Sequence, residues 1–539
     1  MKQITTTAAF RHLIAAAQKG NLTFLAGAGI SKIPPSNLPL GNDIKDYLIS
    51  LITANSALTS HRDNILYSPK YKKLIPELIF QPLYETLEAK MYAAFDILDS
   101  DAYNHVHEVL AWLEVHKNAR LYTTNFDLLI EKSSRATVDV EHLHGALNEP
   151  DEMTIRIYQV GRGIQRKMAT QFQSTNKGRT LFVIGYSGND KDVVTLLNQT
   201  AFQQIYWLMR DATDDWTLSN IKKLTHHDTN IFQGDLKTFF RNAISHYSIP
   251  ATTVGKKGTA TPLVVKDIGI TQVEALRCIQ SIYYTIGEYK KALAVCDIIF
   301  RNKKAKFTAQ DRAWFHQVAA DNITCIGIHF RSAVSHINKS IALSKKHRNT
   351  LDLAEAYNAI GNTYGQRSKS NAADALNALR LAKRAADSLL KKKLPLLQQD
   401  QLYVLLGKIH NNTGLAYDSL GDYHKAIEHY KRSIAYKKKA GNITAIAVTQ
   451  ANISLCYRSL GDRRYLYWEK KAEEIFSQYG LFYRLGYLFR ELGARSKESQ
   501  RTEAITYLEQ ALQVYEGNVP DATFDITLTK RNLIGLKKK

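Results

Sequence analysis

A sequence repeat with a period of 40 residues in the second half of the chain constrains its fold more than any other feature. The segment NTGLAYDSLGDYHKAIEHYKRSI (412–434) matches ANISLCYRSLGDRRYLYWEKKAEEI (451–475), with Tyr417 aligned to Tyr457 and Gly421 to Gly461. Each copy is typical of two helices joined at a Gly-Asp turn. Such a unit cannot bury its apolar face alone, so neighbouring units stack into an extended array.

The first copy is similar to the tetratricopeptide repeat family. Small Gly414 and Ser433 would let two helices approach, and Tyr417 and Tyr430 would fill the space between neighbouring hairpins. We therefore predict an all-α tetratricopeptide-repeat solenoid over residues 269–539, with about five to seven helical hairpins. An ordinary helical bundle is the alternative. Weaker copies of the pattern occur at 283–292, 361–364 and 486–511.

The first half of the chain has a different pattern, in which helical stretches alternate with short β-rich runs. This alternation predicts an α/β, Rossmann-like domain with a largely parallel sheet over residues 1–249. Residues 250–268 are rich in Thr, Gly, Pro and Lys without periodicity, which indicates a linker. The expected strands are Leu22–Ala26, Arg120–Thr124, Thr154–Val160, Thr180–Gly185 and Gln204–Met209.

Charge divides the chain at the same place. Residues 1–250 carry 26 Lys and Arg against 25 Asp and Glu, whereas residues 251–539 carry 46 against 25. The basic excess indicates either a solvated edge with helix-capping value, or a surface that attracts an acidic protein or a polyanion. Because no recognition-helix, zinc-finger or stacking motif accompanies it, we do not expect nucleic acid as a ligand. The basic clusters are Lys303–Lys304, Lys345–Lys346, Lys391–Lys393, Lys437–Lys439 and Lys537–Lys539.

Cysteine content and hydropathy favour a cytoplasmic protein without a membrane partner. The chain has four cysteines and no CxxC pair, which argues against a disulfide framework and a cysteine zinc site. No apolar run approaches the roughly 20 residues that span a bilayer. The apolar stretch Ala8–Ala17 is interrupted by Arg11 and His12, so we expect an amphipathic helix there and not a signal peptide.

The segment NLTFLAGAGISK (21–32) raises the question of nucleotide binding. An apolar run leads into Gly27-Ala28-Gly29, and Ile30-Ser31-Lys32 could open a helix. Glycines let a backbone approach a pyrophosphate, and a helix N-terminus offers it free N–H groups, although many tight corners also use glycine. An ordinary dehydrogenase fold fits badly, because neither Asp43 nor Asp46 follows a strand.

Three further segments place polar residues where strands should end. LYTTNFDLLIE (121–131) contributes Asn125 and Asp127, EHLHG (141–145) contributes His144, and LFVIGYSGNDKDV (181–193) contributes Asp190. In an open α/β sheet, residues just past the carboxyl ends of the strands face the ligand crevice. Glycine, amide, carboxylate and imidazole groups should therefore converge there.

GAGIS, T-x-N-x-D, H-G and G-Y-S in this order resemble the Sir2 (sirtuin) family over about residues 8–245. The spellings TTNFD and GYSGND, and the fusion to repeats, are most similar to the Sir2-like domains of bacterial antiphage defence proteins, which cleave NAD+. The resemblance implies that Asn125 orients the water or ribose and that His144 is the general base. It also implies an NAD+ site formed by Gly27, Ala28, Gly29 and Ser31 at the phosphates and ribose, Asp127 at the nicotinamide, and Gly185, Tyr186, Ser187 and Asp190 at the adenosine.

Simpler structural roles remain open for these residues. His144 could be a buried histidine bonded to a carbonyl, and Asn125 and Asp127 could cap the next helix. The chain also departs from protein-deacylating sirtuins. Residues 1–250 contain no cysteine for a zinc module, so no metal is expected, and about 40 residues between His144 and Gly185 leave little room for a peptide-binding subdomain.

The resulting hypothesis is an NAD+ hydrolase that releases nicotinamide and ADP-ribose, with NAD+ as substrate. As an antiphage effector it would be gated by its repeats, activated there by a protein partner such as a phage protein, and assembled as a homo-oligomer. Two alternatives remain: a Sir2-type protein deacylase or ADP-ribosyltransferase, and a non-catalytic receptor for NAD+ or ADP-ribose.

Overall fold

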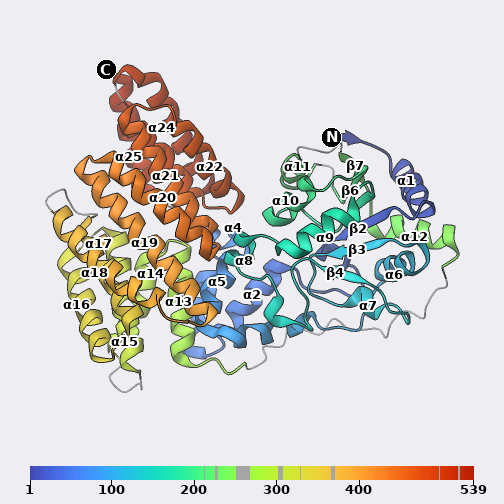
Figure 1. Ribbon diagram of the computed structural model, residues 1–539, viewed down its shortest axis with the longest axis horizontal. Coiled ribbons are helices and arrows are strands. Elements are labelled where there is room, and N and C mark those ends of the chain that lie inside the picture. Colours follow the sequence, from blue (N-terminus) through green and yellow to red (C-terminus); the bar gives the residue numbers. More distant parts are fainter. Residues whose placement is uncertain are drawn as a thin grey trace. The chain divides into compact units, whose positions relative to one another are not determined.

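The chain forms two compact units in the computed structural model (Figure 1). The sheet unit comprises residues 1–54 and 87–270, and the repeat unit comprises residues 55–86 and 271–539. The chain therefore passes between the units three times, at 54/55, 86/87 and 270/271. The residues described are 1–211, 213–224, 229–249, 268–301, 307–327, 329–365, 371–496, 498–519 and 522–538.

The sheet unit is built on seven parallel strands in the order β1-β7-β6-β5-β2-β3-β4. From β2 the chain adds β3 and β4 on one side, and from β5 it adds β6 and β7 on the other. The strand order thus reverses between β2 and β5, which is where open α/β sheets form their ligand crevice. The strands are β1 (Lys2–Gln3), β2 (Leu22–Ala26), β3 (Arg120–Thr123), β4 (Val140–His142), β5 (Thr180–Ile184), β6 (Gln204–Met209) and β7 (Thr229–Gln233).

Helices cover both faces of this sheet. On one face, α1, α6 and α12 bury side chains against Phe24 and Phe182. On the other face, α9 and α10 pack against Leu25 and Val183, because side chains alternate between faces along a strand. The helices of this unit are α1 (Thr6–Gln18), α2 (Gly41–Ile52), α6 (His105–Lys117), α7 (Leu129–Lys132), α8 (Ile157–Arg162), α9 (Arg166–Asn176), α10 (Lys191–Gln199), α11 (Asp215–Ile221) and α12 (Leu236–Tyr247), with 3-10 turns η1 (Ala28–Ile30), η3 (Glu88–Leu98) and η4 (Pro150–Glu152).

Four of the five expected strands are confirmed within a residue, and the parallel sheet with them. The expected strand Thr154–Val160 is wrong, since Ile157–Arg162 is helical. The side chain of Gln159 accepts hydrogen bonds from the N–H groups of Ile155 and Arg156, which starts a helix where the β-branched residues suggested a strand. Strands β1, β4 and β7 were not expected from the sequence.

The repeat unit is all-helical, as expected. In its described part, successive helices pack as six pairs, α13 with α14 through α23 with α24, followed by α25 (Figure 1). They are α13 (Gln272–Thr285), α14 (Tyr289–Arg301), α15 (Ala309–Ile326), α16 (Phe330–Lys346), α17 (Thr350–Gly365), α18 (Ala372–Leu390), α19 (Leu396–Leu420), α20 (Tyr423–Ala440), α21 (Ile443–Leu460), α22 (Tyr465–Gln478), α23 (Phe482–Ala494), α24 (Arg501–Asn518) and α25 (Thr523–Lys538).

Small residues allow the two helices of a pair to approach closely, as expected, whereas Tyr430, expected between neighbouring hairpins, packs against Gly414 of its own pair. A Cβ atom on Gly414 would lie 2.6 Å from the ring of Tyr430, which is fully buried. Gly486 and Tyr515 repeat this arrangement at 2.6 Å in the sixth pair. The small residues are therefore required by packing in α19 and α23.

The division into units differs from the sequence-derived domain boundary at residues 55–86. This inserted segment lies within the expected first domain, 1–249, yet it packs with the repeat unit. It contains η2 (Ser56–Leu58), α3 (Thr59–Leu66), α4 (Pro69–Lys73) and most of α5 (Pro76–Leu87). The other boundary, at 270/271, falls beside the expected linker, whose residues 250–267 lie outside the described ones.

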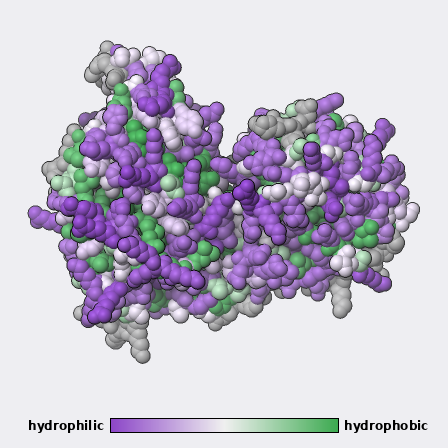
Figure 2. Space-filling view, in the orientation of Figure 1, coloured by the Kyte–Doolittle hydropathy of each residue, from purple (hydrophilic) through white to green (hydrophobic). Residues whose placement is uncertain are grey.

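Hydrophilic side chains cover most of the face drawn in Figure 2, with hydrophobic ones gathered between helices of the repeat unit. None of the described helices is long and apolar enough to cross a membrane. The four cysteines are free thiols. The basic clusters are less uniform than expected, because Lys437 is buried and donates to Thr449, and burial lowers its pKa to about 7. Lys303, Lys304 and Lys539 lie outside the described residues.

Candidate functional site

The residues expected at the site lie beyond the carboxyl ends of neighbouring strands. Ser31 follows β2, Asn125 follows β3, His144 follows β4 and Tyr186 follows β5. These strands are adjacent in the sheet and include the β2/β5 reversal point. The structure therefore places these four residues along one edge of the sheet.

The glycines of GAGIS are explained by packing between two loops. Gly27 N–H donates to the Ile184 carbonyl at 3.0 Å, and Gly29 N–H donates to the Gly185 carbonyl at 2.9 Å. A Cβ atom on Gly27 would lie 2.6 Å from the Gly185 oxygen, and one on Gly29 would lie 2.8 Å from the Gly185 Cα. Gly185 itself has a positive φ of 61°, a conformation that favours glycine.

The helix that Ile30-Ser31-Lys32 could open is not formed. A single 3-10 turn, η1, follows Gly27, and the next α-helix begins only at Gly41. Pro34 and Pro35 lie in between, and the residue before a proline is disfavoured in a helix. An anion site made by a helix N-terminus is therefore not available here, although Ala28 and Ser187 are exposed on these two loops.

The hydroxyl group of Ser31 is the centre of a buried hydrogen-bond network. Its Oγ donates to Asp127 Oδ2 at 2.9 Å and accepts from Asn125 Nδ2 at 3.2 Å. His107 Nε2 lies 3.2 Å from the same oxygen. His107 Nδ1 accepts from the Asn104 N–H, and burial lowers its pKa to about 3, so the neutral ring carries its proton on Nε2 and donates to Ser31. All bonding positions of the hydroxyl are thereby used.

Asn125 and Asp127 are held by hydrogen bonds within the protein, and one acceptor atom of Asn125 remains without a partner among the described residues. Asp127 Oδ1 accepts from the Leu129 N–H at 3.2 Å, which is the capping role left open by the sequence. Burial raises the pKa of Asp127, while the hydrogen bonds from Ser31 and Leu129 oppose this rise. Asn125 Oδ1 is buried and has no hydrogen-bond partner among the described residues. A buried amide oxygen without a partner is unfavourable and marks a place where a ligand or water would bond.

His142 supports Asn125 from the neighbouring strand and is not among the residues expected from the sequence motifs. Its Nδ1 lies 2.7 Å from the Asn125 carbonyl oxygen, and its Nε2 lies 2.7 Å from Glu131 Oε1. Burial alone would lower the pKa of His142, but the hydrogen bond and charge of Glu131 outweigh it and raise the pKa. A protonated ring donates to both partners and fixes the Asn125 backbone.

His144 forms a second cluster with the loop after β5. Its Nε2 lies 3.1 Å from Asp192 Oδ2, and both side chains are almost fully buried. Asp190 lies near this pair: burial raises its pKa, and the charge of His144 opposes the rise. The ring of Tyr186 stacks on that of Trp207, with the ring centroids 5.9 Å apart, and the Tyr186 backbone carbonyl accepts a hydrogen bond from the Trp207 indole N–H. Asp192 was not among the expected residues, although it lies only two positions after Asp190.

The two clusters share an edge of the sheet, but no described contact joins Asn125 to His144. Ser31, Asn125 and Asp127 form one group, and His144, Tyr186 and Asp190 form the other. The interlocked glycines of the β2 and β5 loops connect the groups. Asn125 and His144 are each only 6% exposed, so a dinucleotide would need a loop to move before it reached either side chain.

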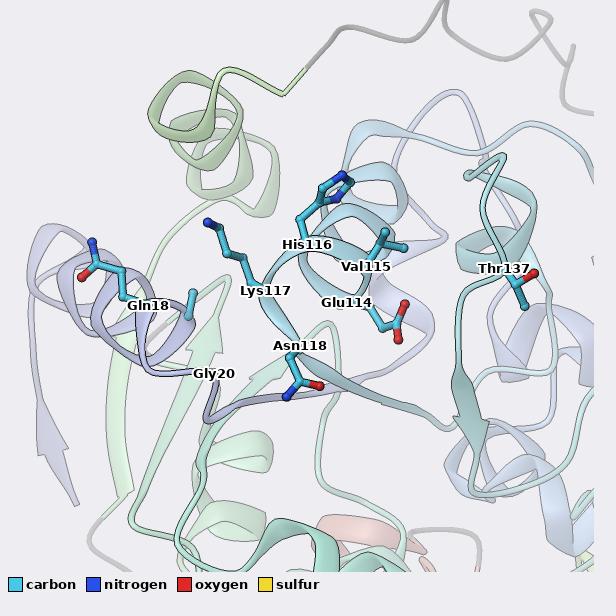
Figure 3. A pocket seen from close by; sticks show the side chains of 9 residues that line it. Gln18, Gly20, Glu114, Val115, His116, Lys117, Asn118 and Thr137 are labelled. Carbon is cyan, nitrogen blue, oxygen red and sulfur yellow. The ribbon is translucent and has the colours of Figure 1, made fainter.

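One hollow on the surface of the sheet unit lies away from these two clusters. An open depression of about 780 Å³ is lined by residues that precede β2, β3 and β4, such as Gly20, Asn118 and Thr137 (Figure 3). These residues are at the amino ends of the strands, opposite the conserved position of ligands in open sheets, so we do not regard the depression as the substrate site. Among described residues, no group of three or more His, Cys, Asp or Glu side chains is placed to hold a metal ion.

Comparisons with known proteins identify a tetratricopeptide repeat at residues 407–439, the unit in which the sequence pattern was strongest. No curated protein matches the chain. One similar solved structure is a Rap protein complexed with competence and sporulation factor, with 13% identity, a TM-score of 0.36, and coverage of 49% of this chain and 74% of that one. Another is a signal transduction ATPase with numerous domains and a tetratricopeptide repeat sensor from Pyrococcus horikoshii, with 11% identity, a TM-score of 0.34, and coverage of 97% and 95%.

Proposed function

We propose that the sheet unit binds NAD+ at the carboxyl ends of β2 and β5 and hydrolyses its nicotinamide–ribose bond. The observation that carries the proposal is the Ser31–Asn125–Asp127 network, in which the Asn125 amide is fixed through its nitrogen while its buried oxygen lacks a partner among the described residues. An acceptor held in this way suits a water molecule or a ribose hydroxyl. The order of the four Sir2-like motifs supports the same assignment.

The proposed reaction breaks the bond between ribose C1′ and the nicotinamide nitrogen. The bonding electron pair leaves with nicotinamide, water forms the new C1′–O bond, and that water loses a proton. Asn125 Oδ1 would orient the water, and Asp127 would stabilise the positive charge that develops on the ribose. His144, whose Nε2 lies 3.1 Å from Asp192 Oδ2, would accept the proton.

We further propose that the repeat unit restrains this activity and that a partner protein releases it. A hydrolase that consumed NAD+ without restraint would harm its own cell, and the burial of Asn125 and His144 supports a resting form with little turnover. The released state would serve antiphage defence, with a phage protein as the activating partner and a homo-oligomer as the active assembly. Stacked helical repeats provide the extended surface that such a partner requires.

The test is product analysis on the purified full chain incubated with NAD+. Nicotinamide and ADP-ribose should appear in equal amounts, without an acylated peptide, and faster when lysate from phage-infected cells is added. Nicotinamide release that required an acylated peptide would instead support the deacylase. Binding of NAD+ without release in every condition would contradict hydrolysis and support the receptor alternative.

A further inference from the structure

An arginine that forms no ion pair within the described part of the chain lies where the first and sixth helix pairs of the repeat unit approach each other. Arg484 is on α23, in the sixth pair. Its electrostatic neighbours are Tyr284 of α13, Tyr289 of α14 and Cys325 of α15, together with the adjacent Tyr483. Between 159 and 200 residues separate Arg484 from the three residues on α13, α14 and α15. We call this place the seam of the repeat unit.

Several side chains of the seam are accessible to solvent and are not buried in the hydrophobic core. Arg484 is exposed, and Tyr284 and Tyr483 are 40% and 39% exposed. Within the described residues Arg484 forms no ion pair, whereas the other two arginines nearby on the chain are paired, Arg490 with Asp525 and Arg495 with Asp418. Among the arginines of α23, Arg484 is therefore the one whose guanidinium group forms no ion pair with a described residue.

The aromatic groups of the seam are held in fixed positions. The rings of Tyr284 and Tyr289 contact each other edge-on at 5.4 Å, and Cys325 Sγ lies 3.9 Å from the Tyr284 hydroxyl. Asp321 is an acidic neighbour of Tyr284, and burial raises the pKa of Asp321 to about 7, which reduces its negative charge and therefore its repulsion of an incoming anion. The Tyr284 hydroxyl can donate a hydrogen bond beside the guanidinium, whereas the Tyr483 hydroxyl already donates to Asp525 at 3.1 Å.

The inserted segment, residues 55–86, contacts the helix pairs on both sides of the seam. Towards the first pair, His61 Nδ1 lies 3.1 Å from the Tyr283 hydroxyl, and Lys70 forms an ion pair with Glu288 at 3.3 Å. Towards the last pair, Lys73 Nζ donates to the Asn518 carbonyl at 2.7 Å. A site held from both sides is organised before binding, which lowers the entropy cost of association.

We propose that the seam is the docking site for an acidic segment of a partner protein, with Arg484 binding one of its carboxylates. A guanidinium group presents a fork of N–H donors that matches a carboxylate, and tyrosines beside it give contact area and further donors. The net charge of +21 over residues 251–539 favours an acidic partner. A nucleic acid would need a track of cations along its backbone, and the seam has a single unpaired one. The proposal concerns binding and does not depend on NAD+ hydrolysis.

The test measures binding of a fluorescein-labelled deca-glutamate peptide to the full chain by fluorescence anisotropy. Arg484→Gln should weaken binding by about tenfold or more, because a charge-assisted hydrogen bond is lost. The matched control is Arg331→Gln on α16. Arg331 is also exposed and has no ion pair among the described residues, and its substitution removes the same charge. Binding to the control should change by less than about twofold. Melting curves confirm that both variants fold.

Three results would overturn the proposal. Equal weakening by Arg484→Gln and Arg331→Gln would mean that the peptide binds diffusely to the basic surface. Tighter binding of a single-stranded oligonucleotide, with the same dependence on Arg484, would assign the seam to nucleic acid. Absence of binding by the unmodified chain at low ionic strength would exclude an acidic docking site. None of these results bears on nicotinamide release, so the failure of each proposal can be recognised separately.

Discussion

Single side chains at the candidate site are fixed by partners that the sequence motifs do not contain. Ser31 belongs to GAGIS, yet its orientation depends on His107 of α6. His144 belongs to the H-G motif, yet Asp192 of α10 holds its ring. A motif identifies groups that could contact a substrate, whereas the residues that orient them come from whichever element the fold places beside them.

Asp192→Asn tests whether this orientation is used. Replacing the carboxylate with an amide keeps the size of the side chain but weakens its hydrogen bond to His144. Nicotinamide release should therefore fall by about 10²-fold or more, with little change in KM. The pH dependence of kcat should also shift, because the imidazole loses its charged neighbour. Steady-state kinetics across pH measure both effects. An unchanged pH profile with a uniform loss of activity would indicate a purely structural role for Asp192.

At the scale of elements, the sequence predicts periodic segments well and non-periodic ones poorly. β2, β5 and β6 are largely apolar runs and β3 is a short β-rich run; all four were predicted, as were the helices beyond residue 270. β4 was missed because Val140, Glu141 and His142 show no apolar run, and a half-buried edge strand needs none. Thr154–Val160 failed because side-chain capping by Gln159 outweighed β-propensity. The edge of the sheet that carries the site was predictable, and its orienting partners were not.

The glycines of the repeat helices permit a contrasting pair of substitutions. Gly414→Ala gains about 1 kcal/mol in helix propensity, but its Cβ would lie 2.6 Å from Tyr430, and overpacking of this kind costs about 1–3 kcal/mol. We expect a lower Tm. Gly535 lies within α25 with nothing inside 4 Å of a Cβ, so Gly535→Ala should raise the Tm or leave it unchanged. Thermal melting compares them, and stabilisation by Gly414→Ala would contradict the packing role.

At the scale of the whole molecule, the three passages of the chain between its units are the feature that no sequence pattern indicated. Residues 55–86 follow α2 of the sheet unit directly, and their contacts are with Tyr283, Glu288 and Asn518 of the repeat unit. Within the repeat unit, this segment contacts both the first and the sixth helix pair. A composition shift marks the boundary near residue 270, but the segment 55–86 has an ordinary composition, so only its packing shows where it belongs.

Stability of the repeat unit should depend on paired histidines. His316 and His410 each face another histidine, with Nδ1–Nδ1 distances of 2.8 Å to His336 and 3.2 Å to His429. Burial, together with the neighbouring imidazole, lowers the pKa of both His316 and His410 to about 4. The unfolded chain, with a histidine pKa of about 6.5, then binds more protons between pH 6.5 and 4, so these groups destabilise the fold as the pH falls through that window.

His410→Gln isolates this effect from groups that titrate in the opposite sense. Burial raises the pKa of Glu469 to about 7, so its contribution to stability changes in the other direction as pH falls. The Tm of His410→Gln relative to the unmodified chain should therefore rise steadily from pH 6.5 to 4, while that of the exposed His424→Gln should stay level. A difference independent of pH would mean that the His410–His429 pair does not resist protonation.

The central claim, that the sheet unit cleaves NAD+ at the carboxyl ends of its strands, is tested most directly by Asn125→Ala. Nicotinamide release and NAD+ binding would be measured on the same preparations, with Asn230→Ala on β7 as the control for loss of an asparagine in the same sheet. We predict that Asn125→Ala still binds NAD+ and melts near the unmodified chain, but releases nicotinamide about 10²-fold more slowly or less. Release at the rate of the unmodified chain by Asn125→Ala would contradict the assignment of this site.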